Sequence, residues 1–267
     1  MTESRTPGFL KPLQGKNALV IGGGGDGIGR AITRALAAAG SAVAVADIDQ
    51  RRADEAAAEA VAAGVKAVGL AGDVRSGDDV DEFVRRAARE LGSLDILATV
   101  VGGHLAFVPA VPLHELADED WDLMFDLNLH YVARAVRSAL RVFLEQGTGG
   151  TIVSVGSITG SAGSPMQAAY GAAKAGLASL ARSVAAEYSR DGIRMNVVAC
   201  GPIATPVALA AGASAAPEWI PMGRSGSSDE VANTAVFLAS PLSSYISGQS
   251  LVVDGGATAA GPFPSGR

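Results

Sequence analysis

The strongest constraint on the fold is a short apolar segment that runs directly into a cluster of glycines and then into an alanine-rich stretch. Residues 17–21 are typical of a buried strand, residues 22–29 are mostly glycine, and residues 30–39 have the composition of a helix. Glycines let the backbone turn tightly and approach a pyrophosphate, and a helix N-terminus offers free N–H groups. This order predicts a nucleotide site on a parallel sheet; the alternative interpretation is a flexible glycine turn.

Apolar strands and helices alternate along nearly the whole chain. The strands are expected at residues 17–21, 42–46, 66–70, 94–101, 151–155, 193–199 and 249–254. The helices are expected at residues 30–39, 50–63, 78–91, 118–146, 167–178 and 227–240, the last of them opened by a capping box from Ser227 to Glu230. We find no internal repeat and no linker. We therefore predict a single doubly wound α/β domain over residues 1–267, with loose tails at 1–14 and 257–267.

Composition excludes several classes of protein. The apolar fraction is 48% and the charged fraction 18%, which is typical of a globular chain. The net charge of −6, with no long basic run, argues against nucleic acid and anionic membrane as partners. The single cysteine, Cys200, excludes an internal disulfide and fits a reducing cytoplasm. Residues 1–8 lack the apolar core of a secretion signal, the apolar run at 96–113 is too interrupted to span a membrane, and the three histidines lack metal-ligand spacing.

Acidic residues follow the second and third expected strands. Asp47 ends the second strand about 20 residues past the glycine loop, where a carboxylate accepts hydrogen bonds from an adenosine ribose. Because it would repel a 2′-phosphate, we expect NAD rather than NADP. Arg51 and Arg52 follow closely and weigh against this preference, unless they lie on the exposed face of the next helix. Asp73, beside Val74, is positioned to bind an adenine amino group or simply to cap its loop.

The stretch at 167–178 is expected to be a helix that carries a tyrosine and a lysine on one face. Tyr170 and Lys174 are four positions apart. A phenol titrates near ~10, and a nearby ammonium favours the phenolate and lowers its pKa, so the pair is a candidate proton-transfer couple. Ser157 follows the fifth strand, where ligands collect in a parallel sheet, although serine there is commonly a turn former. Asn128 is a poor mid-helix residue that either kinks its helix, holds an ordered water or is an ordinary polar position.

Small and apolar residues mark the rest of the expected site. Gly102, after the fourth strand, leaves room for a cofactor against the backbone, and residues 206–221 are alanine-rich and bounded by prolines, which suits a substrate lid. Cys200 is interpreted as a small buried residue because no histidine is fixed beside it. His104 is interpreted as a surface loop residue, with contact to the substrate as the alternative. A partly hydrophobic small-molecule substrate is indicated by Leu105, Phe107, Leu209 and Trp219.

Taken together, these segments resemble the short-chain dehydrogenase/reductase family over residues 13–256. Asn128, Ser157, Tyr170 and Lys174 match the family's catalytic four in order and spacing, and residues 247–249 and 253–256 match its C-terminal signature. The resemblance implies that the cofactor is bound by Gly23, Gly27, Ile28, Gly29, Asp47, Asp73, Val74, Gly102, Tyr170, Lys174, Gly201, Ile203 and Thr205.

The resemblance also implies a fold and an activity. The expected fold is a Rossmann fold of about seven strands with helices on both faces. The expected activity is hydride transfer between NAD(H) and a secondary alcohol or ketone, in a homotetramer. The alternatives are an NADPH-dependent 3-oxoacyl reductase and a non-catalytic NAD-binding sensor or scaffold.

The chain departs from the family pattern at three places. The glycine loop is one residue longer, so either Gly22 or Gly23 takes the first glycine position. Residues 99–102 read Thr-Val-Val-Gly where Asn-Asn-Ala-Gly is common, and Cys200 replaces a usual proline.

Overall fold

One sheet of seven strands runs through the molecule. The computed structural model describes residues 11–104, 106–213 and 217–259. The strands are β1 (Asn17–Ile21), β2 (Ala42–Asp47), β3 (Ala67–Ala71), β4 (Ile96–Thr99), β5 (Gly150–Ser157), β6 (Ile193–Cys200) and β7 (Ser250–Val253). Their spatial order is β3-β2-β1-β4-β5-β6-β7, and every neighbouring pair is parallel. The predicted doubly wound parallel sheet is therefore confirmed.

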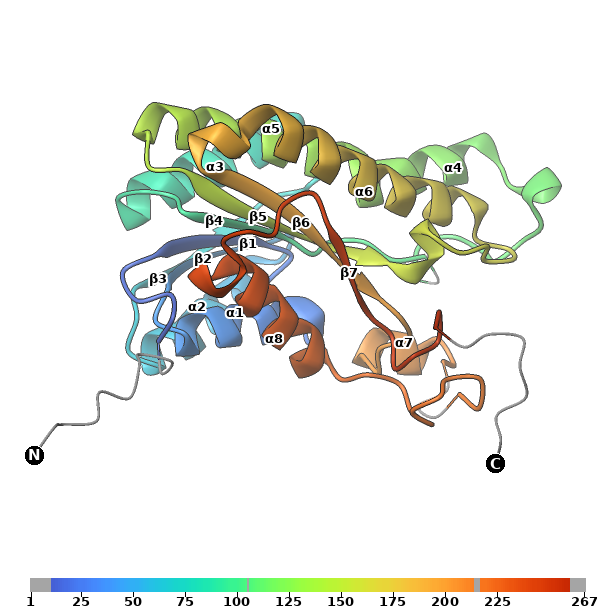
Figure 1. Ribbon diagram of the computed structural model, residues 1–267. Coiled ribbons are helices and arrows are strands. Elements are labelled where there is room, and N and C mark those ends of the chain that lie inside the picture. Colours follow the sequence, from blue (N-terminus) through green and yellow to red (C-terminus); the bar gives the residue numbers. More distant parts are fainter. Residues whose placement is uncertain (1–10, 105, 214–216, 260–267) are drawn as a thin grey trace, which may run out of the picture.

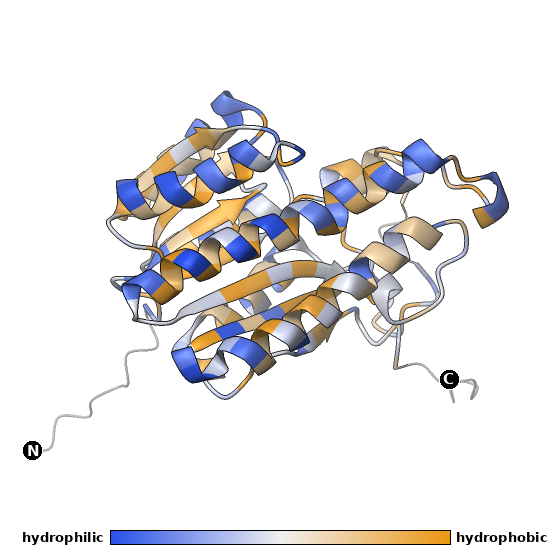
Figure 2. Cartoon of the chain, turned by 90° about the horizontal axis from the view of Figure 1, so that it is seen from above, coloured by the Kyte–Doolittle hydropathy of each residue, from blue (hydrophilic) through white to orange (hydrophobic). Residues whose placement is uncertain are grey.

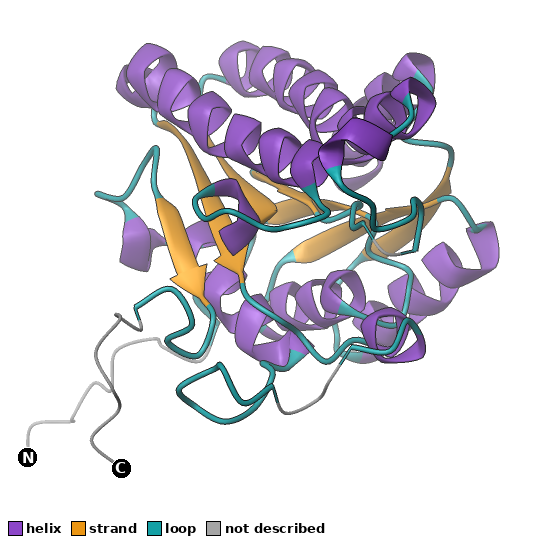
Figure 3. Ribbon diagram, turned by 90° about the vertical axis from the view of Figure 1, so that its right-hand side faces the viewer, coloured by secondary structure: helices purple, strands orange, loops and turns teal. Residues whose placement is uncertain are grey.

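Helices cover both faces of the sheet (Figures 1 and 3). They are α1 (Ile28–Ala38), α2 (Gln50–Ala62), α3 (Gly77–Leu91), α4 (Asp118–Phe125), α5 (Tyr131–Gln146), α6 (Ala168–Tyr188), α7 (Pro206–Ala210) and α8 (Ser228–Ala239). Helices α3, α5 and α6 pack on one face and α1, α2 and α8 on the other, each group with its own apolar cluster. The capping box from Ser227 to Glu230 is present at the start of α8, as predicted.

The apolar character of the strands follows from this double cover. A strand that is buried on both faces reads as a nearly continuous hydrophobic run, and most strand residues are buried. In Figure 2 the strands are largely orange, whereas the helices show blue residues alternating with orange ones. Strand β7 is the exception, because it lies at the edge of the sheet and three of its four residues are exposed.

The order of the strands reverses between β1 and β4. The chain builds β1, β2 and β3 outward in one direction, returns to place β4 beside β1, and then adds β5, β6 and β7 in the other direction. Connections leave this point toward opposite faces of the sheet, which opens a crevice at the carboxyl ends of the strands. The glycine loop after β1 and Gly102 after β4 both lie there.

Three expected segments differ from the structure. The fourth strand ends at Thr99, because the backbone turns away at Gly102 and Gly103 with φ of +144° and +135°. The expected helix at 118–146 is interrupted by a π-helical turn at Asp126–His130. The segment 206–221 is not wholly irregular, since it begins with the short helix α7.

The ends of the described chain are also better packed than predicted. Leu13, expected in a loose tail, is 1% exposed, and its N–H donates to the Ala39 carbonyl at 2.9 Å. Near the other end, Thr258 donates both its backbone N–H and its hydroxyl to Asp254 Oδ2 at 2.7 Å. Residues 1–10 and 260–267, the remainder of the two predicted tails, lie outside the described residues. Within the described ranges, no helix has the length and apolarity needed to span a membrane.

Candidate active site

A large cavity lies over the carboxyl ends of the strands. Its volume is about 1520 Å³, and it extends from the glycine loop and Asp47 past Ser157 and Tyr170 to α7 and Trp219. Ligand pockets for drug-sized molecules are typically about 300–1,000 Å³. The cavity is therefore large enough for an extended ligand together with a second, smaller one.

The glycine loop shows which glycine takes the tight turn. Gly22 has φ of +89°, and a Cβ there would lie 2.7 Å from Val101 Cγ2. A Cβ on Gly29 would overlap the Gly22 carbonyl oxygen, so both positions require glycine. Gly22 lines the cavity with Gly25, Asp26, Gly27, Ile28 and Gly29.

Gly23 is placed differently from the predicted cofactor position. A Cβ there would point at Thr33 Oγ1 (2.7 Å) and Val45 Cγ1 (2.9 Å), inside the protein. Its carbonyl accepts a hydrogen bond from Thr33 Oγ1 at 3.3 Å, and it is absent from the cavity lining. The extra residue of the loop is therefore accommodated by turning Gly23 inward, and Gly22 takes the position at the cavity wall.

Asp47 at the tip of β2 is paired with an arginine. Its side chain is 8% exposed, and Oδ1 accepts hydrogen bonds from Arg52 Nη2 at 2.8 Å and from the Asp49 N–H at 3.1 Å. Arg52 also lines the cavity. The interpretation that both arginines lie on the exposed face of α2 is wrong for Arg52 but correct for Arg51, whose side chain is 72% exposed and bonds Glu55.

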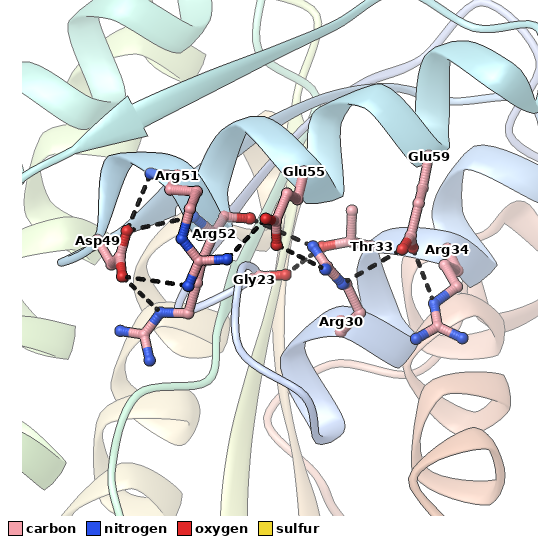
Figure 4. A network of polar contacts seen from close by, with 9 residues as sticks. All are labelled: Gly23, Arg30, Thr33, Arg34, Asp49, Arg51, Arg52, Glu55 and Glu59. Carbon is pink, nitrogen blue, oxygen red and sulfur yellow. Dashed lines mark hydrogen bonds and ion pairs between the residues drawn. The ribbon is translucent and has the colours of Figure 1, made fainter.

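A network of charged residues between α1 and α2 holds Arg52 in place (Figure 4). Arg30 Nη1 donates to the Arg52 carbonyl at 3.2 Å, and the Arg30 guanidinium lies 3.7 Å from both Glu55 and Glu59. The Arg30 side chain is only 8% exposed, so these contacts tie the two helices together beneath the cavity. Glu59 also bonds Arg34 at 3.2 Å.

Asp73 after β3 is bound to a neighbouring arginine. Arg75 donates to both carboxylate oxygens, with Nη2 at 2.6 Å from Oδ2, and this hydrogen bond holds the pKa of Asp73 below its usual value. Asp73, Val74 and Arg75 all line the cavity. Asp73 thus lies after β3 at the cavity wall, and its carboxylate is already hydrogen-bonded to Arg75.

Ser157, Tyr170 and Lys174 come together at the centre of the cavity. Ser157 is the last residue of β5, and its Oγ accepts hydrogen bonds from the Thr159 N–H at 3.2 Å and hydroxyl at 3.0 Å. Ser157 is also close enough to the Tyr170 phenol to act on its pKa, which it lowers. Lys174, which is 5% exposed, donates to the Val155 carbonyl at 3.0 Å and lies 5.6 Å from the centre of the Tyr170 ring.

The charge state of this group differs from the prediction. Burial raises the pKa of Tyr170 to about 12, although Ser157 acts in the opposite direction. Burial also lowers the pKa of Lys174 to about 8. The pKa of Tyr170 is therefore raised where the sequence predicted a lowering, because burial disfavours the phenolate more than Ser157 favours it.

Asn128 lies in the π-helical turn and supports the loop after β4. It is fully buried, its Oδ1 accepts from the Gly103 N–H at 3.0 Å, and its Nδ2 donates to the carbonyls of Gly103 at 3.1 Å and Met124 at 3.0 Å. Of the three alternatives left open for Asn128, a local distortion of the helix fits the π-helical turn, and π turns are frequent at functional sites. Because Gly102 is held between Asn128 and Lys174, a Cβ on Gly102 would overlap Asn128 Oδ1 and lie 3.2 Å from Lys174 Nζ.

The far end of the cavity is largely apolar. Apolar lining side chains there are Phe107, Val207, Leu209 and Trp219, and the cavity wall near the centre includes Gly201, Ile203 and Thr205, as predicted. Cys200 is 6% exposed and burial raises the pKa of its thiol to about 12, so its interpretation as a small buried residue is confirmed. Leu105 lies outside the described residues.

His104 is the main residue that sequence reasoning misjudged. It is 6% exposed and lines the cavity, so the expectation of an exposed loop residue is wrong. The centre of its ring lies 6.1 Å from that of Tyr170. Its place directly after two glycines at the end of a central strand was the available signal, because such a strand ends in the crevice.

Comparison with known proteins identifies the family. The family model described as enoyl-(acyl carrier protein) reductase matches residues 23–258. The chain is 40% identical to the cis-4-hydroxycyclohexanecarboxylate dehydrogenase of Sinomonas cyclohexanicum, over 90% of this chain and 96% of that one. It is 35% identical to a 3-oxoacyl-[acyl-carrier-protein] reductase of Synechocystis sp., over 92% and 98%.

Solved structures agree with these sequence matches. A short-chain type dehydrogenase/reductase from Mycobacterium marinum superposes with a TM-score of 0.86 at 32% identity, covering 93% of this chain and 97% of that one. A 7α-hydroxysteroid dehydrogenase complexed with NADH and 7-oxo glycochenodeoxycholic acid gives 0.83 at 30% identity, over 92% and 95%. The chain therefore belongs to the short-chain dehydrogenase/reductase family of oxidoreductases.

Proposed function

We propose that this protein transfers a hydride between NAD(H) and a secondary alcohol or its ketone. The observation that carries the proposal is a large cavity lined by Asp47, Ser157 and Tyr170, together with a smaller pocket of about 180 Å³ that shares Ser157 and Tyr170 and is also lined by Lys174. A bound nicotinamide supplies or accepts the hydride, and the protein orients it. Ser157 and Tyr170 then bind the oxygen of the substrate, and Lys174 lies beside the Tyr170 ring.

The lining of the cavity fits a dinucleotide. The N-cap of α1 is Gly27, so no side-chain cap occupies the first-turn N–H groups that bind phosphate in such folds. Gly22, Gly25, Gly27, Gly29 and Gly102 line the cavity without side chains, so an elongated ligand can lie against the backbone there. We assign the remaining predicted cofactor contacts to Ile28, Gly29, Asp73, Val74, Gly201, Ile203 and Thr205.

Each central residue has a role that follows from its contacts. Tyr170 exchanges the proton of the substrate hydroxyl at its phenolic oxygen, and with a pKa of about 12 it is protonated at neutral pH and ready to donate to a ketone. Ser157 Oγ, already beside that phenol, donates to the substrate oxygen and stabilises developing charge. Asn128 fixes the loop at Gly103. Membership of the family adds two roles: Lys174 would hold the nicotinamide ribose, and Asn128 would hold a water that links Lys174 to solvent.

NAD is favoured over NADP by the carboxylate at β2. Asp47 lines the cavity where an adenosine ribose would lie, and a 2′-phosphate would meet its charge. Arg52 partly neutralises that charge, but its guanidinium is held by Asp47 at 2.8 Å. The pair is thus arranged to accept two ribose hydroxyls rather than a phosphate.

Removing this carboxylate is expected to reverse the preference. In Asp47→Ala, Arg52 loses its partner and becomes available to a 2′-phosphate, so the ratio of NADPH to NADH affinity should rise by at least about tenfold, a change of about 1.4 kcal/mol. Fluorescence titration with both cofactors measures it. Arg52→Met is the matched control and should not favour NADPH. A wild-type preference for NADPH would contradict the assignment.

The substrate is proposed to be a partly hydrophobic secondary alcohol, probed first with cyclic alcohols. The apolar end of the cavity supports the first part, with α7 and Trp219 in the segment 206–221, which we assign as a substrate lid. The choice of cyclic alcohols is supported by the names of two similar proteins. These are a dehydrogenase of cis-4-hydroxycyclohexanecarboxylate and, at 35% identity, a dehydrogenase of 2,5-dichloro-2,5-cyclohexadiene-1,4-diol. The similarity to 3-oxoacyl reductases supports the second candidate, an NADPH-linked 3-oxoacyl reductase.

The test of the proposed function is a titration with NADH and NADPH, run beside NAD-dependent turnover of a panel of secondary alcohols. Tight NADH binding with turnover is the expected result. NADH binding without turnover of any alcohol or 3-oxoacyl thioester would instead favour a non-catalytic sensor. Failure to bind either cofactor would contradict the proposal, because the lengthened glycine loop would then not form a site.

The protein is expected to be a cytoplasmic homotetramer. Strand β7 is an exposed sheet edge, with Leu251 40% and Val252 43% exposed, and such an edge is normally covered. Light scattering should give about four times the chain mass of 26.7 kDa. Val252→Glu should lower this mass, whereas Val61→Glu, on the exposed side of α2, should not. A monomeric wild type would refute the assignment.

A further inference from the structure

His104 is a buried polar side chain whose hydrogen-bonding capacity is unused. It directly follows Gly103, lines the cavity and lies 6.1 Å from Tyr170, ring centre to ring centre, with the two rings tilted by 46°. Within the described parts of the chain, neither Nδ1 nor Nε2 has a hydrogen-bond partner, and both are covered from solvent. A buried donor or acceptor without a partner is unfavourable, and a ligand atom that pairs with it relieves that cost.

The chemistry of the ring defines what it can bind. Burial lowers the pKa of His104, which keeps the imidazole neutral at physiological pH. A neutral imidazole carries one N–H donor and one acceptor nitrogen. It therefore suits an uncharged hydroxyl or carbonyl group.

The other polar side chains at this end of the cavity already have partners. Thr159 donates to Ser157, and Ser164 donates to Gln167 Oε1 at 3.0 Å. Thr205 Oγ1 accepts from a backbone N–H in α7, and Thr258 is bound to Asp254. Among the described lining residues at this end, His104 is thus the buried side chain whose polar atoms all lack a partner, whereas Gln167 already accepts a hydrogen bond at Oε1.

Charged lining residues lie elsewhere. Among the described residues they are Asp26 in the loop after β1, Asp47 at the end of β2, Arg52 in α2, and Asp73 and Arg75 after β3, with Lys174 in the smaller adjoining pocket. Phe107, whose N–H donates to the His104 carbonyl at 2.9 Å, lines the cavity, as does Leu209. A substrate with a charged group at this end would find no opposite charge there, which again favours an uncharged oxygen.

We infer that His104 binds a second, uncharged oxygen of the substrate while Tyr170 and Ser157 hold the reacting one. The ring turns to present one nitrogen to that oxygen. The inference rests on the proposed function and narrows it to compact alcohols or ketones that carry another hydroxyl or carbonyl across an apolar body. His104 is then a residue for substrate specificity rather than for proton transfer.

A selectivity measurement tests this assignment. The probes are trans-cyclohexane-1,4-diol, which has oxygens at opposite ends of the ring, and cyclohexanol, which has one. The wild-type kcat/KM with NAD should be at least about tenfold higher for the diol, and His104→Phe, which keeps an aromatic ring without nitrogens, should lose most of this ratio. His104→Asn, which keeps a donor and an acceptor, should restore part of it.

His114→Phe is the matched control. It makes the same chemical change outside the cavity, at a side chain that is 80% exposed. It should leave the ratio unchanged. A diol-to-cyclohexanol ratio that is equal in wild type and His104→Phe would overturn the inference, as would an equal loss of activity on both probes.

A second readout does not depend on turnover. The chain has three histidines, so protein labelled with ¹⁵N-histidine gives few imidazole signals, and His104→Phe identifies those of His104. With NADH bound, the diol cannot react, and its addition should shift the His104 signals while cyclohexanol does not. Unmoved His104 signals beside intact NADH binding would overturn this inference alone. Absence of both NADH binding and turnover would instead contradict the proposed function on which this inference rests.

Discussion

Tyr170→Phe is expected to lower kcat by roughly 10²–10⁴-fold, the range that a positioned acid–base group contributes. The variant removes the phenolic oxygen that lies close to Ser157 and is proposed to exchange the substrate proton. The ring is retained, so the contact with Lys174 at 5.6 Å and the packing of α6 persist. NADH affinity, measured by fluorescence titration, should change little.

Tyr188→Phe makes the same chemical change at the end of the same helix, away from the cavity, and serves as its control. It should retain most of the wild-type turnover. Comparable turnover in Tyr170→Phe and wild type would remove Tyr170 from the proposed mechanism. A parallel loss of NADH binding would instead show that the phenol is needed to form the site.

Gly102→Ala is expected to lower kcat/KM by roughly 10²-fold, as misplacement of reacting groups by about 1 Å can do. The added Cβ would overlap Asn128 Oδ1 and lie 3.2 Å from Lys174 Nζ, so it must displace one of them. The severe overlap is with Asn128 Oδ1, which is fixed by bonds to Gly103 and Met124, so the loop after β4 or the Asn128 side chain has to move, and Lys174 has to adjust as well. Steady-state kinetics and a thermal melt measure the two consequences.

Gly103→Ala separates this collision from backbone strain. Both glycines have positive φ, +144° and +135°, so an alanine at either position should cost about 1–3 kcal/mol of stability. At Gly103, however, the nearest atom to an added Cβ is Phe107 Cε2 at 3.6 Å, an ordinary contact. Equal losses of kcat/KM in the two variants would mean that strain alone explains the effect.

The charge states explain why the cofactor matters to this site. Without ligands, burial raises the pKa of Tyr170 to about 12 and lowers that of Lys174 to about 8. At neutral pH the phenol is therefore protonated, which suits reduction of a ketone, while oxidation of an alcohol requires the phenolate. A positive charge beside the phenol would favour the phenolate. Higher pH also favours the phenolate, so the rate of alcohol oxidation is expected to rise with pH more than the rate of ketone reduction.

Local sequence patterns determined the architecture. The alternation of apolar strands and helices depends on side-chain periodicity within each segment, and it predicted all seven strands of the sheet to within a few residues. The spacing of Tyr170 and Lys174 placed them on one helix, and the capping box fixed the start of α8. These features depend on neighbours in the chain, which is why the sequence alone was sufficient to predict them.

Contacts between distant segments decided the rest. Gly22, not Gly23, reaches the cavity because Gly23 packs on Thr33 and Val45. The Arg52 side chain, although 41% exposed, lies at the cavity wall because its guanidinium bonds Asp47. The sequence left three roles open for Asn128, and its bonds to Gly103, which join residues 25 positions apart, could not be predicted from it.

The same reason applies to charge and burial. The direction of the Tyr170 pKa depends on how thoroughly the fold desolvates the phenol, and the burial of His104 depends on the walls that surround the loop after β4. Neither desolvation nor the absence of a partner can be seen in a spacing of residues, because both are sums over groups that only the packed molecule brings together.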